Sequence, residues 1–415
     1  MTFDPKRTIA ELKELRSLTA DDNGAQRVAW TDTWLNARNW FESKLAELPV
    51  EHHYDAAGNG WATLRGESEK ALIIGSHLDS VPNGGWLDGA LGVLTGLEIL
   101  RRFAAEYNGR PPVTVRVVDW ADEEGARFGR SLLGSSAFAG TDSIAVDRGR
   151  TDKEGIRLEA ALRRCGVDID RFPESQAEQK NAAAYLELHI EQGPVLERLG
   201  LPLAVVMGTK GVERHSITFS GQEAHSGSTP MGDRRDALAP LAKLALEIYS
   251  IAGKHKDAVC TIGSVKTFPG IVTAVVGRCE ATLDQRDLNA EALAQMYREA
   301  KEASEDFAEQ HGCSVEWSRI WNIEPVPFHP QLRQFCDEAI FEIAGNGIKL
   351  PSGPLHDAAE VSRVGIPTVM MFVQSLYGIS HNKIEDTKED HLEMAIRAMD
   401  VLARKAAKWI SEQPR

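Results

Sequence analysis

The 415-residue sequence lacks the features that mark several classes of protein. It has only five cysteines, and no two of them form a CxxC pair. An odd, unpatterned set of cysteines argues against a disulfide framework and suits a reducing compartment. No stretch of about 18 consecutive apolar residues is present, so no transmembrane helix is expected.

An excess of positive charge is also missing. The chain carries 61 acidic against 47 basic residues, which gives a net charge of -14. Nucleic acids and anionic membranes need a basic face, so neither is expected as a partner. The N-terminal segment "MTFDPKRTIAELKELRS" is polar and lacks the apolar core of a signal peptide. We therefore expect a cytoplasmic protein.

The length and the hydrophobic content of 42% predict more than one globular domain. Four apolar segments have the composition of buried strands: 71–75, 113–120, 183–193 and 366–382. A helical pattern of leucines follows the first of them and precedes the second. This strand–helix–strand order predicts an α/β domain with a mainly parallel, mixed sheet.

The segment between residues 214 and 330 follows another order. Its patterns predict strand, helix, two strands, helix and strand, which is the βαββαβ order of a ferredoxin-like domain. The third of these strands, "AVVGRCEATLDQRDL", is expected over 274–288. Since a large-sheet strand follows at 366–382, we expect this domain to be inserted into the first. The predicted boundaries are 1–213 and 331–415 for the α/β domain and 214–330 for the insertion.

Residues that can bind metals recur just after the predicted strands of the α/β domain. In open α/β sheets, this carboxyl edge is where ligands bind. The candidate ligands are His77, Asp88, the Glu123/Glu124 pair, His189 and His381. Mixed imidazole and carboxylate donors suit Zn²⁺, Mn²⁺, Co²⁺ or Ni²⁺. Asp88 can bridge two such ions through its two oxygens, and Asp79 can orient His77 by accepting its second N–H.

Each candidate also has a structural interpretation. Asp88 lies just before a helix and can be its N-cap, adjacent glutamates commonly form a solvated turn, and a single histidine is commonly a hydrogen-bonded structural residue. The metal hypothesis is favoured because four separate strand ends each supply such a group, and the structural interpretation would have to explain all four independently. A non-catalytic binding protein would be expected to have lost some of these residues, and none is lost.

The motifs as a set resemble the hydantoinase/carbamoylase family of dinuclear-metal amidohydrolases. This family includes N-carbamoyl-L-amino acid hydrolases, β-ureidopropionases and allantoate amidohydrolases, and it belongs to the aminoacylase/carboxypeptidase-like superfamily. The matching segments, in order, are "GSHLDSVPNGGWLDGALGVL", "DEEGARFGRSLLGS", "ELHIEQGPVLE", "GQEAHSGSTPMGDRRDAL", "DQRD", "SGPLHDA" and "GISHNKIEDT".

The resemblance implies a role for each matching residue. His77 and His381 would hold different ions, Asp88 would bridge them, and Glu124 and His189 would complete the set. Glu123 would be the general base that takes a proton from the attacking water. The substrate would be bound by Gln192, His225, Thr273, Arg286, His356 and Gly378. Among these, His225 would polarise the scissile carbonyl, in its own or a partner subunit, and Arg286 would pair with a carboxylate. A turn-capping loop histidine is the structural alternative for His225.

The sequence departs from the family pattern where the substrate would bind. The family's "PNxxNxxPG" is here "PGIVTAVVG" (269–277), with Thr273 at the position of the second asparagine. The resemblance therefore predicts a homodimeric, two-metal amidohydrolase with a ferredoxin-like lid, and leaves its substrate open. An N-carbamoyl-L-amino acid or a related ureido acid is the first choice. N-acyl amino acids and allantoate are the alternatives.

Overall fold

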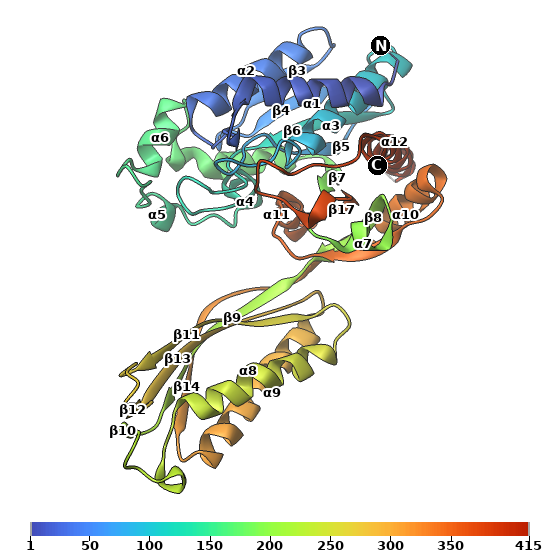
Figure 1. The fold of residues 1–415 in the computed structure, drawn as a ribbon. Coiled ribbons are helices and arrows are strands. Elements are labelled where there is room, and N and C mark those ends of the chain that lie inside the picture. Colours follow the sequence, from blue (N-terminus) through green and yellow to red (C-terminus); the bar gives the residue numbers. More distant parts are fainter. Residues whose placement is uncertain (1, 414–415) are drawn as a thin grey trace. The chain divides into compact units, whose positions relative to one another are not determined.

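The computed structural model describes residues 2–413, which divide into two compact units (Figure 1). The first unit contains the described residues up to Met207 and from Phe328 onward, and the second is Gly208–Pro327. The second unit begins before the expected residue 214 because its first strand, β9 (Gly211–Ser220), starts earlier than the apolar pattern indicated. No helix in residues 2–413 combines the length and the apolar character that crossing a membrane requires.

Among the described residues, nine strands of the chain form one mixed sheet, in the order β15-β8-β17-β7-β5-β6-β4-β3, with β16 paired to β8. The four central strands are parallel. The strands on either side of them run antiparallel to their neighbours. The bounds are β3 (Glu51–Tyr54), β4 (Gly60–Leu64), β5 (Ser68–His77), β6 (Val113–Trp120), β7 (Ala182–Ile190), β8 (Leu203–Thr209), β15 (Val326–Pro327), β16 (Ile348–Ser352) and β17 (Thr368–Val373). The predicted α/β fold with a mainly parallel core is confirmed.

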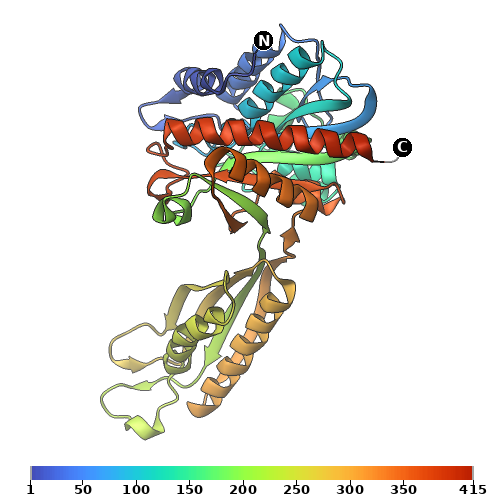
Figure 2. The same ribbon diagram turned by 90° about the vertical axis from the view of Figure 1, so that its right-hand side faces the viewer.

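Helices cover this sheet, and Figure 2 shows α12 lying along it. The helices α3 and α12 pack on β5, β6 and β7, while α11 packs on β7 and β17. Because helices cover the central strands, these are buried along most of their length, as parallel strands usually are. The helices are α1 (Pro5–Thr19), α2 (Asp32–Leu45), α3 (Ala90–Glu106), α4 (Leu133–Ala139), α5 (Ile144–Asp147), α6 (Leu158–Arg164), α7 (Val195–Leu199), α10 (Pro330–Ala344), α11 (Asp357–Arg363) and α12 (Glu389–Glu412). Short elements complete the unit: β1 (Ala20–Asp21), β2 (Gly24–Ala25), η1 (Ile169–Gln179) and η3 (Leu376–Gly378).

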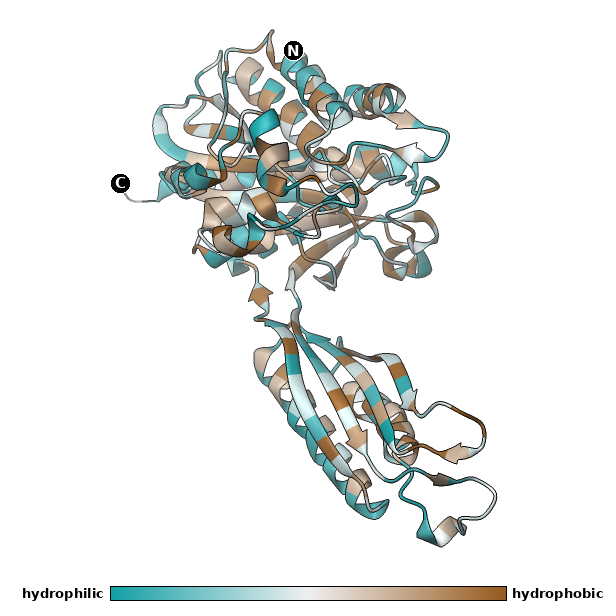
Figure 3. Ribbon diagram, turned by 90° about the vertical axis from the view of Figure 1, so that its left-hand side faces the viewer, coloured by the Kyte–Doolittle hydropathy of each residue, from teal (hydrophilic) through white to brown (hydrophobic). Residues whose placement is uncertain are grey.

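The second unit contains an antiparallel sheet with the strand order β11-β13-β9-β14. Together with its two helices, this is the ferredoxin-like order that the sequence predicts. Apolar positions alternate with polar ones along its strands (Figure 3), and the apolar side chains pack against α8 and α9. The elements are α8 (Leu238–Gly253), β11 (Val259–Phe268), β13 (Arg278–Asp287), α9 (Ala290–Gln310) and β14 (Ser314–Ile323), with β10 (Ala224–His225), β12 (Ala274–Val275) and η2 (Met231–Asp233) between them.

One predicted strand of this unit is wrong. The sequence pattern indicated a continuous strand over 274–288, but the structure divides it into β12 and β13. The break occurs at Gly277, whose N–H donates to the carbonyl of Phe268 and whose own carbonyl accepts from Gly221. A β-carbon at this glycine would overlap Glu223. The chain therefore leaves β12, which pairs with β10, before β13 begins.

Candidate metal centre

The carboxyl ends of the central strands bring the predicted ligands together. His77 is the last residue of β5, and His189 lies next to the end of β7. The Glu123/Glu124 pair follows β6, and His381 lies in the loop after β17. Since these four strands are neighbours in the sheet and run parallel, their ends meet at one edge.

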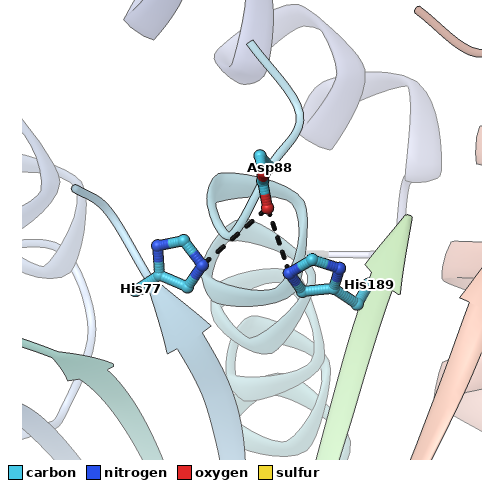
Figure 4. A group of neighbouring side chains, drawn as sticks. All are labelled: His77, Asp88 and His189. Carbon is cyan, nitrogen blue, oxygen red and sulfur yellow. Dashed lines mark ion pairs between the residues drawn. The ribbon is translucent and has the colours of Figure 1, made fainter. Parts of the chain in front are cut away.

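Asp88 lies at the centre of this group (Figure 4). Its Oδ1 is 3.1 Å from Nε2 of His189 and 3.9 Å from Nε2 of His77. Its other oxygen, Oδ2, is 3.3 Å from Nε2 of His381, and the same nitrogen is 3.3 Å from Oε2 of Glu124. The Asp88 carboxylate thus faces His77 and His189 with one oxygen and His381 with the other.

The structure decides against the N-cap interpretation of Asp88. The N-cap of α3 is Gly89, and no side chain caps this helix. Gly89 has a φ of 64°, and a β-carbon there would overlap the imidazole of His77. Only glycine combines this conformation with so close an approach. The loop therefore places the Asp88 carboxylate beside the histidines instead of over the helix N-terminus.

The prediction for Asp79 needs a correction. Nδ1 of His77 faces the backbone carbonyl of Asp79 at 3.1 Å, while the nearer carboxylate oxygen is 3.6 Å away. The Asp79 carboxylate instead accepts the backbone N–H groups of Glu123 and Glu124, both at 3.2 Å. The difference arises because the chain turns after β5 and directs this side chain toward the turn that follows β6. Asp79 therefore fixes the two glutamates, and a carbonyl fixes the imidazole.

Glu123 is buried, with an exposed fraction of 7%, so it is not part of a solvated turn. Its Oε2 lies 3.7 Å from Nε2 of His77. Burial raises the pKa of Glu123 well above its usual range, and the negative charges of Asp357 and Glu124 act in the same direction. A carboxylate in such surroundings is suited to receive and hold a proton.

Asp88 responds to its surroundings in the opposite way. Burial alone disfavours its charged form, but contacts with His189 and His381 outweigh this effect and hold the pKa of Asp88 well below its usual range. The same interaction acts on the partner: burial disfavours the protonated form of His189, yet Asp88 raises the pKa of His189 to about 9. Asp88 is therefore the anionic centre of the cluster.

Three residues next to the cluster have backbone conformations that non-glycine residues rarely adopt. Asp122, Gln192 and His381 have φ values of 58°, 56° and 55°. Each follows one of the central strands, and each conformation costs on the order of 1–3 kcal/mol. Such conformations persist only where the surrounding contacts impose them; for example, Nε1 of Trp30 donates to Asp122 at 2.7 Å. Three strained backbone positions thus lie at this edge of the sheet.

The donor set fits a divalent metal. Three groups of ligand atoms each lie within 4.8 Å of one another. Two of them share Asp88: His77, Asp88 and His189, and Asp88, Glu124 and His381; the third is Glu187, His189 and His356. Oε1 of Glu124 and Nε2 of His189 are buried and lack a hydrogen-bond partner in the structure. At 3.1 Å from Asp88, His189 has the distance of a hydrogen bond but not the angle. Buried ligand atoms that lack a hydrogen-bond partner and lie among several carboxylates can be satisfied by binding a cation.

An open cleft of about 700 Å³ gives access to these groups. Asp88, Glu123, Glu124, His189 and His381 line it, and so do the predicted substrate contacts Gln192, His356 and Gly378. Nε2 of Gln192 donates to Asp88 Oδ2 at 3.0 Å. The imidazole of His356 is buried with its Nε2 unpaired, and burial lowers the pKa of His356 well below its usual range. His356 is therefore neutral at pH 7.

The other predicted substrate residues belong to the second unit. His225 on β10 pairs with Ala274 of β12, and the N–H of Ser226 donates to the carbonyl of Thr273 at 2.9 Å. His225 and Thr273 are therefore neighbours. Nδ1 of His225 accepts the N–H of Gly227 at 3.1 Å, which is the turn-capping contact of the structural alternative. Its exposed ring keeps Nε2 for another partner.

Arg286, on β13, has a carboxylate partner within its own unit. Its Nε donates to Oδ1 of Asp284 at 2.8 Å. Asp284 is shared, because Arg214 also pairs with it at 2.6 Å. A substrate carboxylate at Arg286 would therefore add to an existing ion pair.

Two residues that the sequence interpretation did not single out contact the cluster. The hydroxyl of Ser380 lies 3.0 Å from Oδ2 of Asp88 and 2.8 Å from Oε2 of Glu385. Both residues lie within "GISHNKIEDT", so their position close to His381 was the sequence signal that could have identified them. A sequence pattern does not distinguish a buried glutamate from a solvated one in such a polar segment.

The α/β sheet thus carries, at one edge, donor clusters that could hold a divalent metal beside a buried glutamate. The chain belongs to the peptidase family M20/M25/M40, whose family model matches residues 73–405.

Relatives with curated names support a more specific class. The chain is 36% identical to an N-carbamoyl-L-amino acid amidohydrolase of Geobacillus stearothermophilus over 88% of this chain and 90% of that protein. It is 30% identical to an allantoate amidohydrolase of Bacillus subtilis, over 93% of each chain. A crystal structure of a hydantoinase/carbamoylase family amidase from Burkholderia multivorans has 31% identity and a TM-score of 0.87, with 98% of each chain covered. The predicted resemblance is confirmed, and the protein is an amidohydrolase.

Proposed function

We propose that this protein hydrolyses the ureido C–N bond of an N-carbamoyl-L-amino acid or a related ureido acid, and that it does so with two divalent ions. The observation that carries the proposal is the position of Asp88, one oxygen of which faces His77 and His189 while the other faces His381. A carboxylate placed in this way would be shared by the two ions of a two-metal site. The names of the amidohydrolase relatives support the choice of bond.

In this proposal His77, Asp88 and His189 hold one ion, and Asp88, Glu124 and His381 hold the other. The ions would be Zn²⁺, or Mn²⁺, Co²⁺ or Ni²⁺, which all accept mixed imidazole and carboxylate donors. When bound, such ions lower the pKa of water toward about 7 and polarise a carbonyl.

The side chains of the chain would carry out the proton transfers. Glu123, buried beside His77, accepts the proton of the attacking water and passes it to the departing nitrogen. Asp79 fixes the backbone of this glutamate and of Glu124. His356 is held neutral by burial, so it can donate a hydrogen bond to substrate without adding charge.

The second unit would supply the remaining substrate contacts. His225 and Thr273, which are neighbours on the β10–β12 pair, would contact the scissile group, and Arg286 would bind a carboxylate. In the proposal this unit is both lid and dimerisation domain, and the enzyme works as a homodimer in the cytoplasm. The small ureido substrate leaves no role for a nucleic acid or a membrane.

A substrate panel tests this proposal. Metal-loaded protein is incubated with N-carbamoyl-L-amino acids, allantoate and N-acyl amino acids, and ammonia and free amine are measured separately. Hydrolysis of a carbamoyl amino acid releases ammonia, carbon dioxide and the amino acid, so ammonia and free amine should rise in equal amounts. Free amine without ammonia would refute the carbamoyl assignment and favour an N-acyl amino acid. Ammonia from allantoate alone would move the assignment to that substrate.

A further inference from the structure

Glu385 is a buried glutamate that lies behind Asp88. Its exposed fraction is 2%, and it lies four residues after His381, in the segment that leads to α12. Its Oε1 accepts the backbone N–H groups of Leu87 and Asp88, both at 3.1 Å. One carboxylate oxygen of Glu385 thus fixes the backbone at Asp88 and at Leu87, the residue before it.

The other oxygen of Glu385 acts on the same residue from the opposite side. Oε2 lies 2.8 Å from the hydroxyl of Ser380, and this hydroxyl lies 3.0 Å from Oδ2 of Asp88. Ser380 also directly precedes His381, the ligand that faces Oδ2. Glu385 therefore contacts Asp88 through its backbone and, by way of one serine, through the carboxylate that would bridge the ions.

The loop that carries Asp88 is shaped around this glutamate. A β-carbon added to Gly85 would overlap the carboxyl group of Glu385, and its three nearest atoms all belong to that group. Gly85 does not have a positive φ, so an alanine is excluded there by Glu385 and not by the backbone. The absence of a side chain at this position leaves the space that the carboxylate occupies.

We infer that Glu385 is a positioning residue that sets the orientation of Asp88 and thereby the binding of the second ion, the one between Asp88 Oδ2, Glu124 and His381. The inference rests on the two-ion site of the proposed function. Residues that orient metal ligands through hydrogen bonds typically change metal affinity by about 10- to 100-fold when they are replaced. The ion on the His381 side depends more on Glu385, because both Ser380 and His381 lie on the segment that Glu385 holds.

Calorimetric titration of the metal-free protein with Mn²⁺ tests the inference. The wild type should bind two ions per chain. Glu385→Ala should keep the first ion and lose about 10- to 100-fold in affinity for the second. Glu385→Gln should lie closer to wild type than to Glu385→Ala, since its amide oxygen still accepts both backbone N–H groups and its NH₂ donates to Ser380.

Glu98 on α3 provides a matched control. It is fully buried, accepts the N–H of Asp4 at 2.7 Å and pairs with Arg7 and with Arg101, and none of these contacts involves Asp88. Glu98→Ala should lower the melting temperature and leave the Mn²⁺ stoichiometry at two. A loss of the second ion in both variants would show that general destabilisation is responsible, and it would overturn the inference.

Gly85→Ala gives a second test that does not remove the glutamate. In the wild-type background the added methyl group displaces the Glu385 carboxylate, so the second ion should be weakened as in Glu385→Ala. In the Glu385→Ala background the space is open, and the same methyl group should have little further effect. Additive effects of the two substitutions would contradict the inference.

The two proposals fail separately. A wild type that binds fewer than two Mn²⁺ ions, or releases no ammonia from the substrate panel, contradicts the proposed function. A wild type that binds two ions and releases ammonia, together with a Glu385→Ala variant of unchanged Mn²⁺ affinity, contradicts only the role of Glu385.

Discussion

The strands at the centre of the first unit are buried on both faces, whereas β13, at the centre of the second unit's sheet, is buried on one face only. All eight residues of β6 and all six of β17 are buried. Along β13, by contrast, every second residue is buried and the others are partly or fully exposed. Side chains at the ends of fully covered strands have few alternative positions, because close packing fixes the strands themselves. The first unit is thus the better support for a metal centre.

One buried histidine from each unit shows that the two units also differ in the electrostatic surroundings that they give a side chain. His189 in the first unit has Asp88 as a partner, and its pKa is raised to about 9 although burial opposes this. His215 in the second unit packs on Tyr297 with ring centroids 4.6 Å apart, and neither of its ring nitrogens has a hydrogen-bond partner in the structure. Burial, with Arg319 nearby, lowers the pKa of His215 to about 4. Burial lowers the pKa of both rings. The nearest carboxylate oxygen is 3.1 Å from Nε2 of His189, in Asp88, but 3.7 Å from Nε2 of His215, in Glu213, so the closer carboxylate decides the sign of the shift.

The largest effect is expected at the buried glutamate of the metal centre. Glu123→Gln should lower kcat by about 10²- to 10⁴-fold, because the amide cannot accept the proton of the attacking water. The ion content should not change, since Glu123 is outside both ligand clusters. Steady-state kinetics and elemental analysis of the same preparation measure the two quantities. Full activity with both ions bound would contradict the general-base assignment.

A smaller effect should separate the two sheets directly. Ile74 in β5 is fully buried, so Ile74→Ala should cost about 2–5 kcal/mol of unfolding free energy through the cavity it leaves. Ile320 in β14 is 52% exposed, and Ile320→Ala should change stability by no more than about 0.5 kcal/mol. Urea unfolding followed by circular dichroism gives both values. Equal losses at the two positions would show that the exposed face of β14 is covered in solution.

The smallest effect concerns the pH dependence of the second unit. Because the folded pKa of His215, about 4, lies below the usual 6.5, the unfolded chain binds more protons between these values. The stability due to the neutral ring is complete above about pH 6.5 and is lost as the pH falls toward 4, with a loss on the order of 2 kcal/mol at pH 5. His215→Phe should reduce the difference in melting temperature between pH 7.5 and pH 5. An unchanged difference would show that His215 is not the titrating group.

Much of the fold was predictable because its signals are local. The apolar runs of β5, β6, β7 and β17 and the alternation in the second unit follow from side-chain periodicity. The break between β12 and β13 was not predictable, since it depends on Gly277 meeting the backbone of distant residues. The candidate metal ligands could be predicted from residue type and from their position just after a strand.

The chemical groups available to this protein follow from its residue order alone. That order determined which imidazoles and carboxylates follow which strands, and the motifs that resemble the hydantoinase/carbamoylase amidohydrolases. How these groups face one another depends on the folded chain. The fold directed the carboxylate of Asp79 to the backbone of Glu123 and Glu124, and it placed Glu385 against the peptide groups of Leu87 and Asp88. The physical reason is that a hydrogen bond depends on distance and angle between atoms far apart in the chain, and residue order alone does not specify either quantity.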